Sequence, residues 1–181
     1  MNHLFVFCGP IASGKSSISK LFATRVGATW NGFGSTVRKI ALERGLATDR
    51  ESLQCLGAVL IKDETVIFCS RVIELAVNAP NKPAVIDGLR HLTILQELRH
   101  MFNPRKVVCM YIDTPLAIRL ERVKKRDDIS PKQLAKLEMH STEVEVEHQL
   151  KEIADVIIDN QSSAAECVDS IVNLVQKRCL Q

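Results

Sequence analysis

Residues 9–16, Gly9-Pro10-Ile11-Ala12-Ser13-Gly14-Lys15-Ser16, decide the fold of this chain. They match the pattern G-x-x-x-x-G-K-[ST] of the phosphate-binding P-loop. The apolar run Leu4-Phe5-Val6-Phe7-Cys8 directly precedes them and predicts a buried strand. Apolar residues at helical spacing follow them, namely Ile18, Leu21, Phe22 and Val26. A chance match in a glycine-containing turn is the alternative, and the flanking strand and helix argue against it.

Each fixed position of this loop has a physical role. Gly9 and Gly14 permit a tight turn that points backbone N–H groups at phosphate oxygens. Lys15 brings a positive charge to the β- and γ-phosphates, and the Ser16 hydroxyl is suited to ligate Mg²⁺. We therefore expect ATP and Mg²⁺ as cofactors. The residues expected to bind them are Gly9, Ala12, Ser13, Gly14, Lys15, Ser16 and Ser17.

The composition is that of an ordinary globular domain. The chain has 181 residues, of which 46% are hydrophobic and 25% charged, and we treat residues 1–181 as a single domain. The net charge of +3 is too small to indicate nucleic-acid binding. The N-terminus lacks a signal-peptide pattern, and no segment approaches the ~18 apolar residues of a membrane span. We expect a cytoplasmic monomer or homodimer with no membrane partner.

The six cysteines indicate a reducing compartment. None belongs to a C-x-x-C pair and most have apolar neighbours, so they are predicted to be buried thiols rather than zinc ligands or disulfides. They are Cys8, Cys55, Cys69, Cys109, Cys167 and Cys179.

Short apolar strands alternate with longer helices along the chain. Strands are predicted at residues 4–8, 28–30, 84–86, 107–112 and 156–158. Helices are predicted at residues 15–26, 35–44 and 92–102, and further helices should begin at the N-cap residues Thr48, Asp63, Thr114, Ser130 and Ser163. Apolar strands without alternation, separated by helices, predict an α/β fold with a parallel sheet covered on both faces.

Candidate site residues follow the predicted strands, where parallel sheets bind ligands. Asp87 follows residues 84–86 and is suited to hold Mg²⁺ through water, or else Asp87-Gly88 supplies only turn chemistry. Arg90 is suited to bind an acceptor phosphate with both guanidinium arms, or else is a solvated surface residue. Asp113 and Asn160 follow the last two strands.

Three arginines are predicted to share one helix face. Arg119, Arg122 and Arg126 stand at i, i+3 and i+7, so their mutual repulsion would be relieved by a polyphosphate bound among them. They can also stabilise charge during phosphoryl transfer. The alternative is an exposed helix face neutralised by nearby acidic residues. The P-loop favours the functional interpretation, in which the segment around residues 119–140 is a flap over the site.

A second phosphate site is predicted at the turn Gly32-Phe33-Gly34-Ser35. The backbone N–H groups of this turn, including that of Gly34, can reach a phosphate, and Arg38 can clamp it. A helix arginine that faces solvent is equally consistent with the pattern.

These segments together resemble the P-loop nucleoside monophosphate kinase-like family. The resemblance is nearest to the branch that contains dephospho-CoA kinases, phage deoxynucleoside monophosphate kinases and uncharacterised archaeal kinase-like proteins. It covers nearly the whole chain and rests on an ordered set of segments, of which only the P-loop is specific by itself. The segments are residues 9–16, 33–38, 48–54, 56–57, 85–90, 119–122 and 154–160.

The resemblance implies a three-layer fold with a parallel sheet in the order 2-3-1-4-5, an acceptor-binding helical region at about 33–80 and a helical lid at about 119–140. It implies that Arg38 and Arg90 face the acceptor phosphate. The lid arginines Arg119, Arg122 and Arg126 would close on ATP, and Asn160 would lie beside the adenine. The chain departs from adenylate kinases, since Asp87-Gly88-Leu89-Arg90 lacks their extra proline and the lid lacks zinc cysteines.

The expected function is transfer of the γ-phosphoryl group of ATP to a nucleotide-like acceptor, first of all a nucleoside or deoxynucleoside monophosphate. Lys15, Arg90 and the lid arginines would supply positive charge, while Ser16 and Asp87 would position Mg²⁺. Two alternatives stay open. One is phosphorylation of a hydroxyl group, as in dephospho-CoA kinases, with Asp87 as the base. The other is a nucleotide-binding regulatory module with little turnover.

Replacement of Lys15 by alanine tests the P-loop assignment. Lys15→Ala should reduce ATP-dependent turnover to background, because it removes the positive charge beside the transferred phosphate. The melting temperature should change by less than about 3 °C, since no packed side chain is lost. Measurement of ADP release and of a thermal melt on the same preparation checks both expectations, and surviving activity would contradict the assignment.

Overall fold

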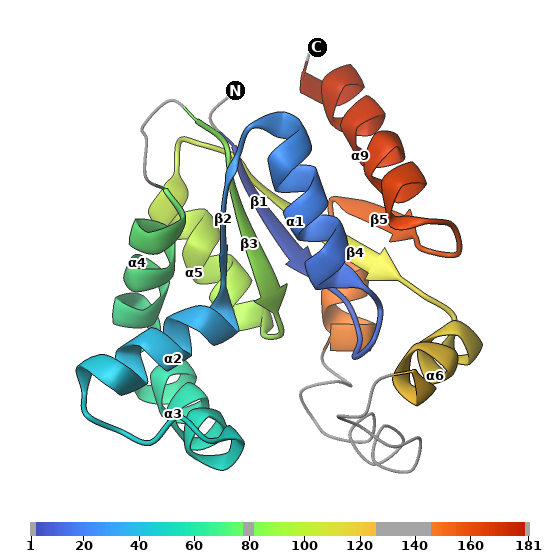
Figure 1. The fold of residues 1–181 in the computed structure, drawn as a ribbon. Helices are drawn as coiled ribbons and strands as arrows, with labels where there is room; N and C mark the ends of the chain where they lie inside the picture. The colour runs from blue at the N-terminus through green and yellow to red at the C-terminus, as the bar shows by residue number, and fades with distance from the viewer. Residues whose placement is uncertain (1–2, 78–81, 126–145, 180–181) are drawn as a thin grey trace.

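A parallel sheet forms the centre of the computed structural model, which describes residues 3–77, 82–125 and 146–179. The sheet has five strands in the order β2-β3-β1-β4-β5 (Figure 1). The predicted fold class and strand order are confirmed. The strands are β1 (Leu4–Cys8), β2 (Thr29–Gly32), β3 (Ala84–Leu89), β4 (Val107–Asp113) and β5 (Val156–Asp159).

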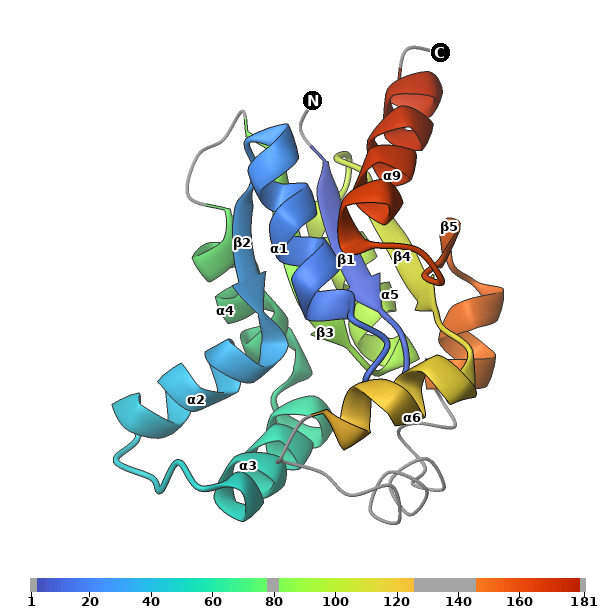
Figure 2. The ribbon, with the colours of Figure 1, turned by 45° about the vertical axis from the view of Figure 1, so that its right-hand side comes forward.

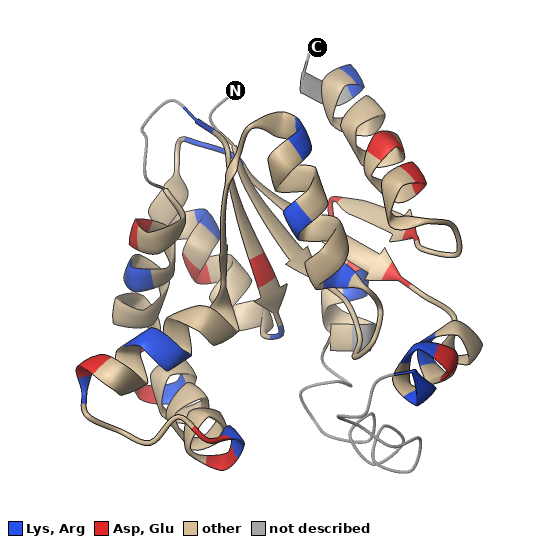
Figure 3. Cartoon of the chain, in the orientation of Figure 1, with Lys and Arg blue, Asp and Glu red and all other residues tan. Residues whose placement is uncertain are grey.

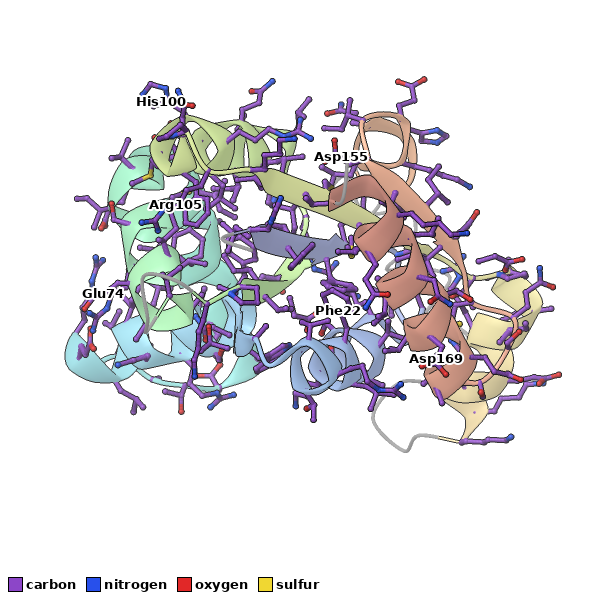
Figure 4. All side chains as sticks on the ribbon, turned by 90° about the horizontal axis from the view of Figure 1, so that it is seen from above. Phe22, Glu74, His100, Arg105, Asp155 and Asp169 are labelled. Atoms are coloured by element: carbon purple, nitrogen blue, oxygen red, sulfur yellow. The ribbon has the colours of Figure 1, made fainter. Side chains whose placement is uncertain are left out.

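Helices cover both faces of this sheet (Figure 2). The helices α1 (Lys15–Val26) and α9 (Ala164–Cys179) pack on one face, where Phe22 of α1 contacts Phe5 and Phe7 of β1. Seen from above, Phe22 points from α1 toward the sheet (Figure 4). The other elements are α2 (Phe33–Glu43), α3 (Arg50–Asp63), α4 (Thr65–Ala76), α5 (Leu92–Phe102), α6 (Leu116–Lys124) and the π-helical turn η1 (Val146–Leu150).

The second face of the sheet carries the larger part of the core. Leu4, Val6 and Cys8 of β1 point into it, since side chains alternate along a strand. Buried residues of α2, α3, α4, α5 and η1 join the same apolar cluster. Both faces of β1 are therefore buried, as its uninterrupted apolar sequence predicts.

A bulge in β3 shapes the edge of the sheet where the strands end. Phe7 is opposite Asp87 and Cys8 is opposite Leu89, so Gly88 is the extra residue. Its φ of +89° is a conformation that glycine adopts readily. The expectation that this strand covers only residues 84–86, with Asp87 after its end, is therefore wrong. Pairing with β1 continues past the bulge to Leu89, and Asp87 lies inside the strand.

Two predicted helix starts are shifted by one residue. The cap of α3 is Asp49 and not Thr48, because the Asp49 carboxylate accepts hydrogen bonds from two N–H groups of the first turn, both at 3.0 Å. Asp63 is the last residue of α3 and does not cap α4. Glu64 occupies that position and makes no side-chain cap.

The start of α6 also differs from its prediction. Pro115 is the N-cap of α6, so Thr114 lies outside the helix and its hydroxyl is used elsewhere. The predicted capping box of α9 is confirmed. The Ser163 N–H donates to the Glu166 carboxylate at 3.0 Å, and Ser163 Oγ accepts from the Glu166 N–H at 3.3 Å. The start predicted at Ser130 lies outside the described residues.

Most of the described cysteines are buried, as predicted. Cys8, Cys69, Cys109 and Cys167 lie in the interior, whereas Cys55 is exposed on α3. Burial raises the pKa of the Cys69 thiol to about 12. Among the helices that the structure describes, none has the length and apolar character that a membrane span requires.

Candidate functional site

The P-loop connects β1 to α1 at the edge where the parallel strands end (Figures 1 and 2). Gly9 has a φ of +144°, and a Cβ there would lie 2.7 Å from the Ile112 carbonyl oxygen. Gly14 has a φ of +83°, and Ala12 between them also has a positive φ of 61°. The loop therefore takes a conformation that side chains at its two glycine positions would oppose. It ends at the N-terminus of α1, which attracts anions.

A hydroxyl and a carboxylate meet beside this loop. Ser16 Oγ donates a hydrogen bond of 2.6 Å to Asp87 Oδ2, which joins the first turn of α1 to β3. Asp87 is buried, and its second oxygen, Oδ1, accepts no hydrogen bond within the described part of the chain. An unsatisfied buried carboxylate oxygen next to a hydroxyl is a donor set that fits a hard divalent cation such as Mg²⁺.

The Lys15 side chain folds back onto the P-loop. Lys15 Nζ donates to the Pro10 carbonyl oxygen at 3.2 Å. A neutral carbonyl is a weaker partner for an ammonium group than a phosphate is. An incoming polyphosphate can therefore replace the Pro10 carbonyl as the partner of the Lys15 ammonium group.

A pocket of about 320 Å³ opens on one side of the loop. It lies between the start of α1, the end of α6 and the turn that follows β5. Its lining residues are Gly14, Ser17, Ile18, Arg122, Lys125, Asn160 and Ala164. The structure thus brings together four residues that the sequence analysis assigned to the nucleotide, namely Gly14, Ser17, Arg122 and Asn160.

A second pocket of about 190 Å³ lies on the side of β3 and α2. It is lined by Phe33, Gly34, Val37, Ile61, Phe68, Gly88, Leu89, Arg90, His91 and Ile94. Gly34 and Arg90, both expected to bind the acceptor, meet here. Burial lowers the pKa of the Arg90 guanidinium, against the opposing effect of the nearby Asp87 carboxylate. A guanidinium remains charged after such a shift.

Arg38 does not line this second pocket. It is exposed on α2, where Nη1 donates to the Thr48 carbonyl oxygen at 3.2 Å. At the turn 32–35, helix α2 begins at Phe33, and the Gly32 N–H donates to Ser35 Oγ at 3.1 Å, so that N–H is satisfied within the turn. The phosphate site expected at this turn stays a prediction.

Two of the three predicted arginines pack against the P-loop. Basic residues on α6 and at the start of α1 lie at the same end of the molecule (Figure 3). Arg119 is buried, with Nε donating to the Thr114 carbonyl oxygen at 3.2 Å and Nη1 donating to that of Ile11 at 3.5 Å. Arg122 Nη1 donates to the Ser13 carbonyl oxygen at 2.9 Å. Arg126 and residues 126–140 of the predicted lid lie outside the described residues.

Three hydrogen bonds near the loop have no signal in the sequence that predicts them. Trp30 Nε1 donates to Ser19 Oγ at 3.0 Å, and Ser19 Oγ donates to the Ser16 carbonyl oxygen at 3.2 Å. Thr114 Oγ1 donates to the Ser13 carbonyl oxygen at 3.0 Å. The signals for Thr114 were its place directly after a strand and its context as a helix cap, and neither indicates a contact with the loop. Asp113, which was singled out, instead forms an ion pair with Lys151 at 2.8 Å.

Residues 6–168 match a family described as "AAA domain". The chain belongs to this family of P-loop proteins. It is 31% identical to the "UPF0200 protein" of Thermococcus onnurineus over 129 residues, which cover 68% of each chain. It is also 27% identical to the "Cytidylate kinase" of Methanocella arvoryzae over 173 residues, which cover 94% of this chain and 86% of that protein. The P-loop kinase-like family expected from the motifs is confirmed.

Solved structures of P-loop kinases share the fold. The shikimate kinase of Aquifex aeolicus has a TM-score of 0.60 at 14% identity, and the alignment covers 98% of both chains. A gluconokinase of Sinorhizobium meliloti has a TM-score of 0.62 at 16% identity, with 99% of this chain and 97% of that one covered. Both show the same architecture around their sheets, and at this identity they show the fold alone.

Glycine-to-alanine substitutions test how tightly the loop is built. Gly9→Ala should destabilise the protein by roughly 1–3 kcal/mol and weaken ATP binding, because the new Cβ meets the Ile112 carbonyl in a strained backbone conformation. Gly57→Ala is the matched control, since nothing lies within 4 Å of its added Cβ in helix α3. It should leave the melting temperature unchanged or raise it. Equal melting temperatures and ATP affinities for the two variants would refute this account of the loop.

Proposed function

We propose that this protein is an ATP-dependent kinase that phosphorylates a nucleoside or deoxynucleoside monophosphate. The observation that carries the proposal is the hydrogen-bonded Ser16–Asp87 pair, with a pocket lined by sequence neighbours of each residue. Gly14 and Ser17, on either side of Lys15 and Ser16, line the first pocket. Gly88, the residue after Asp87 in β3, lines the second. We infer that two ligands bound in these pockets meet at the hydroxyl–carboxylate pair.

The lining of the second pocket favours an acceptor with an aromatic base and one phosphate. Phe33 and Phe68 line it with ring centroids 5.7 Å apart, and most of its other lining residues are aliphatic or glycine. Arg90 and His91 are the polar side chains among these lining residues. A base can lie against the apolar surface while its phosphate binds the Arg90 guanidinium. A polyhydroxylated acceptor would need more hydrogen-bonding side chains than this lining offers.

The proposed chemistry consists of positioning and charge neutralisation. The phosphate oxygen of a monophosphate acceptor is already anionic, so the reaction needs no strong base. Lys15 and Arg122 would bind the phosphates of ATP, and Arg90 would orient the acceptor phosphate. Ser16 Oγ and the Asp87 carboxylate would hold Mg²⁺, which when bound neutralises charge on the β- and γ-phosphates.

Two features support this reading over phosphorylation of a hydroxyl group. Transfer to a hydroxyl requires a base, whereas the unpartnered Asp87 Oδ1 beside the Ser16 hydroxyl forms a donor set that fits Mg²⁺, and a carboxylate bound to a cation is a weaker base. Arg90, a cation suited to an acceptor phosphate, lines the second pocket. The relative named "Cytidylate kinase", which aligns with 94% of the chain, adds support for a monophosphate acceptor.

An acceptor panel tests the proposal directly. The protein is incubated with ATP and Mg²⁺, and ADP release is measured with each common ribo- and deoxyribonucleoside monophosphate, with dephospho-CoA, and with gluconate and shikimate. At least one monophosphate should raise ADP release about tenfold or more above the rate without acceptor. Stimulation by dephospho-CoA alone would show a hydroxyl acceptor instead. ATP binding without stimulation by any acceptor would favour the regulatory module.

Substitution of Arg90 tests the acceptor side of the site. Arg90→Ala should raise the KM of the stimulating monophosphate by about tenfold to a hundredfold, because a charge-assisted, bidentate contact is lost. The KM of ATP should change by less than about twofold. Arg90→Lys is the matched control. Its KM for the monophosphate should lie between those of the native protein and Arg90→Ala, because lysine keeps the charge but lacks the planar guanidinium group. A larger effect on ATP than on the acceptor would move Arg90 to the donor side.

A further inference from the structure

One carbonyl oxygen of the P-loop is held by side chains from distant parts of the chain. The Ser13 oxygen accepts from Thr114 Oγ1 at 3.0 Å and from Arg122 Nη1 at 2.9 Å. It also accepts from Asn160 Nδ2. Thr114 follows β4, Arg122 is on α6, and Asn160 follows β5. A carbonyl oxygen has two lone pairs, so these contacts use its full accepting capacity.

The two neutral donors are shielded from water. Thr114 is 3% exposed, Asn160 is 2% exposed and Ser13 is fully buried. A second contact orients the Asn160 amide group, because the Cys167 thiol donates a hydrogen bond of 3.3 Å to Asn160 Oδ1. Burial raises the pKa of Cys167, so its thiol keeps the proton that it donates. The Asn160 amide N–H₂ is thereby turned toward the Ser13 oxygen.

The direction of this carbonyl fixes the direction of the next N–H group. In a trans peptide the C=O and the following N–H point in opposite directions. Contacts that draw the Ser13 oxygen toward the ends of β4 and β5 therefore turn the Gly14 N–H to the opposite side, away from Thr114 and Asn160. Gly14 also leaves room for the contacts, since a Cβ there would lie 3.0 Å from Asn160 Nδ2 and 3.1 Å from Arg122 Nη1.

We propose that Thr114 and Asn160 are positioning residues that set the P-loop for polyphosphate binding. They hold the Ser13 carbonyl so that the Gly14 N–H is aimed at a phosphate oxygen before the nucleotide arrives. We call these two side chains with the Ser13 oxygen the carbonyl clamp. The proposal rests on the proposed function only in taking a polyphosphate as the ligand of the loop, and it requires no particular acceptor.

The clamp also gives Arg122 a separate role. A guanidinium gains more from a phosphate than from a neutral carbonyl, so a bound polyphosphate attracts Arg122 away from Ser13. Thr114 and Asn160 carry no charge and keep the carbonyl in place when Arg122 leaves. Arg122 is thus the exchangeable contact of the Ser13 oxygen, and the two neutral side chains are the permanent ones.

A pair of substitutions at Thr114 isolates the hydroxyl group. Thr114→Val keeps the shape of the side chain and removes the donor, whereas Thr114→Ser keeps the donor. Affinities for inorganic tripolyphosphate, ATP and adenosine are measured by calorimetry without acceptor. Thr114→Val should weaken tripolyphosphate and ATP by about tenfold each, which corresponds to about 1.4 kcal/mol. Thr114→Ser should stay within about twofold of the native protein, and adenosine binding should not change.

Three outcomes would overturn the clamp. If the Thr114→Val variant has the tripolyphosphate affinity of the native protein, the Thr114 contact does not position the loop. If Thr114→Ser loses as much tripolyphosphate affinity as Thr114→Val, the methyl group and not the hydroxyl is what binding requires. Loss of ATP affinity with unchanged tripolyphosphate affinity places the effect on the base. A negative acceptor panel leaves these binding measurements intact, so failure of the proposed function is distinguishable from failure of the clamp.

A second variant covers the case in which Thr114→Val does not fold. Asn160→Asp keeps the size of the side chain and places a carboxylate oxygen where an N–H₂ group faced the Ser13 oxygen. It should weaken tripolyphosphate more than Thr114→Val does, because a donor is replaced by a repelling acceptor. When both variants fold, the double variant should show non-additive losses, since the two side chains share one acceptor. Native affinity in Asn160→Asp would also overturn the clamp.

Discussion

The pairing of β1 with its two neighbours is the constraint on which the site depends. β1 is five residues long and wholly buried, and it pairs with β3 on one side and β4 on the other. This register places Asp87 opposite Phe7, two residues before the P-loop begins, and brings Ile112 against Gly9. A slip of one residue would turn alternate side chains to the other face and remove Asp87 from Ser16. The positions of the loop, the carboxylate and the end of β4 thus follow from one set of backbone hydrogen bonds.

Cationic side chains at the same edge of the sheet donate hydrogen bonds to backbone oxygen atoms. Lys15 donates to the Pro10 carbonyl, Arg119 to those of Ile11 and Thr114, and Arg122 to that of Ser13. Arg119 is buried, and a charge in the interior needs such partners, because burying it without them is costly. Lys15 and Arg122 are half-buried. A phosphate is a stronger partner than a carbonyl, so a bound polyphosphate can replace the carbonyl contacts of these two side chains.

The sequence predicts the donor side of the site better than the acceptor side, and the reason is physical. The P-loop is a local pattern, since its glycines, lysine and serine act within one turn of backbone, and the apolar strands fix the sheet around it. Side chains that choose among distant partners are not readable in this way. Thr114 has the sequence context of a helix cap yet donates to a loop 101 residues away, and Arg38 donates to Thr48 while Arg90 lines the pocket. These choices depend on which elements the fold brings side by side. The bulge at Gly88, which decides where Arg90 lies, likewise arises only when β3 pairs with β1.

The two pockets are built from different parts of the chain, and this division explains why the ligand of the second pocket is harder to predict from the sequence. With the strand order β2-β3-β1-β4-β5, the connection from β1 runs to β2 on one side and the connection from β3 runs to β4 on the other, and ligands of such sheets bind at the switch point between β1 and β3. The first pocket takes its walls from α1, α6 and the turn after β5, while the second takes them mainly from α2, α3, α4 and the end of β3. Changes in α2–α4 can therefore alter the second pocket without disturbing β1 or its loop. The proposed chemistry of phosphate binding and that of the acceptor are thus separable in the fold, and the proposed acceptor must be sought in the side chains that line the second pocket.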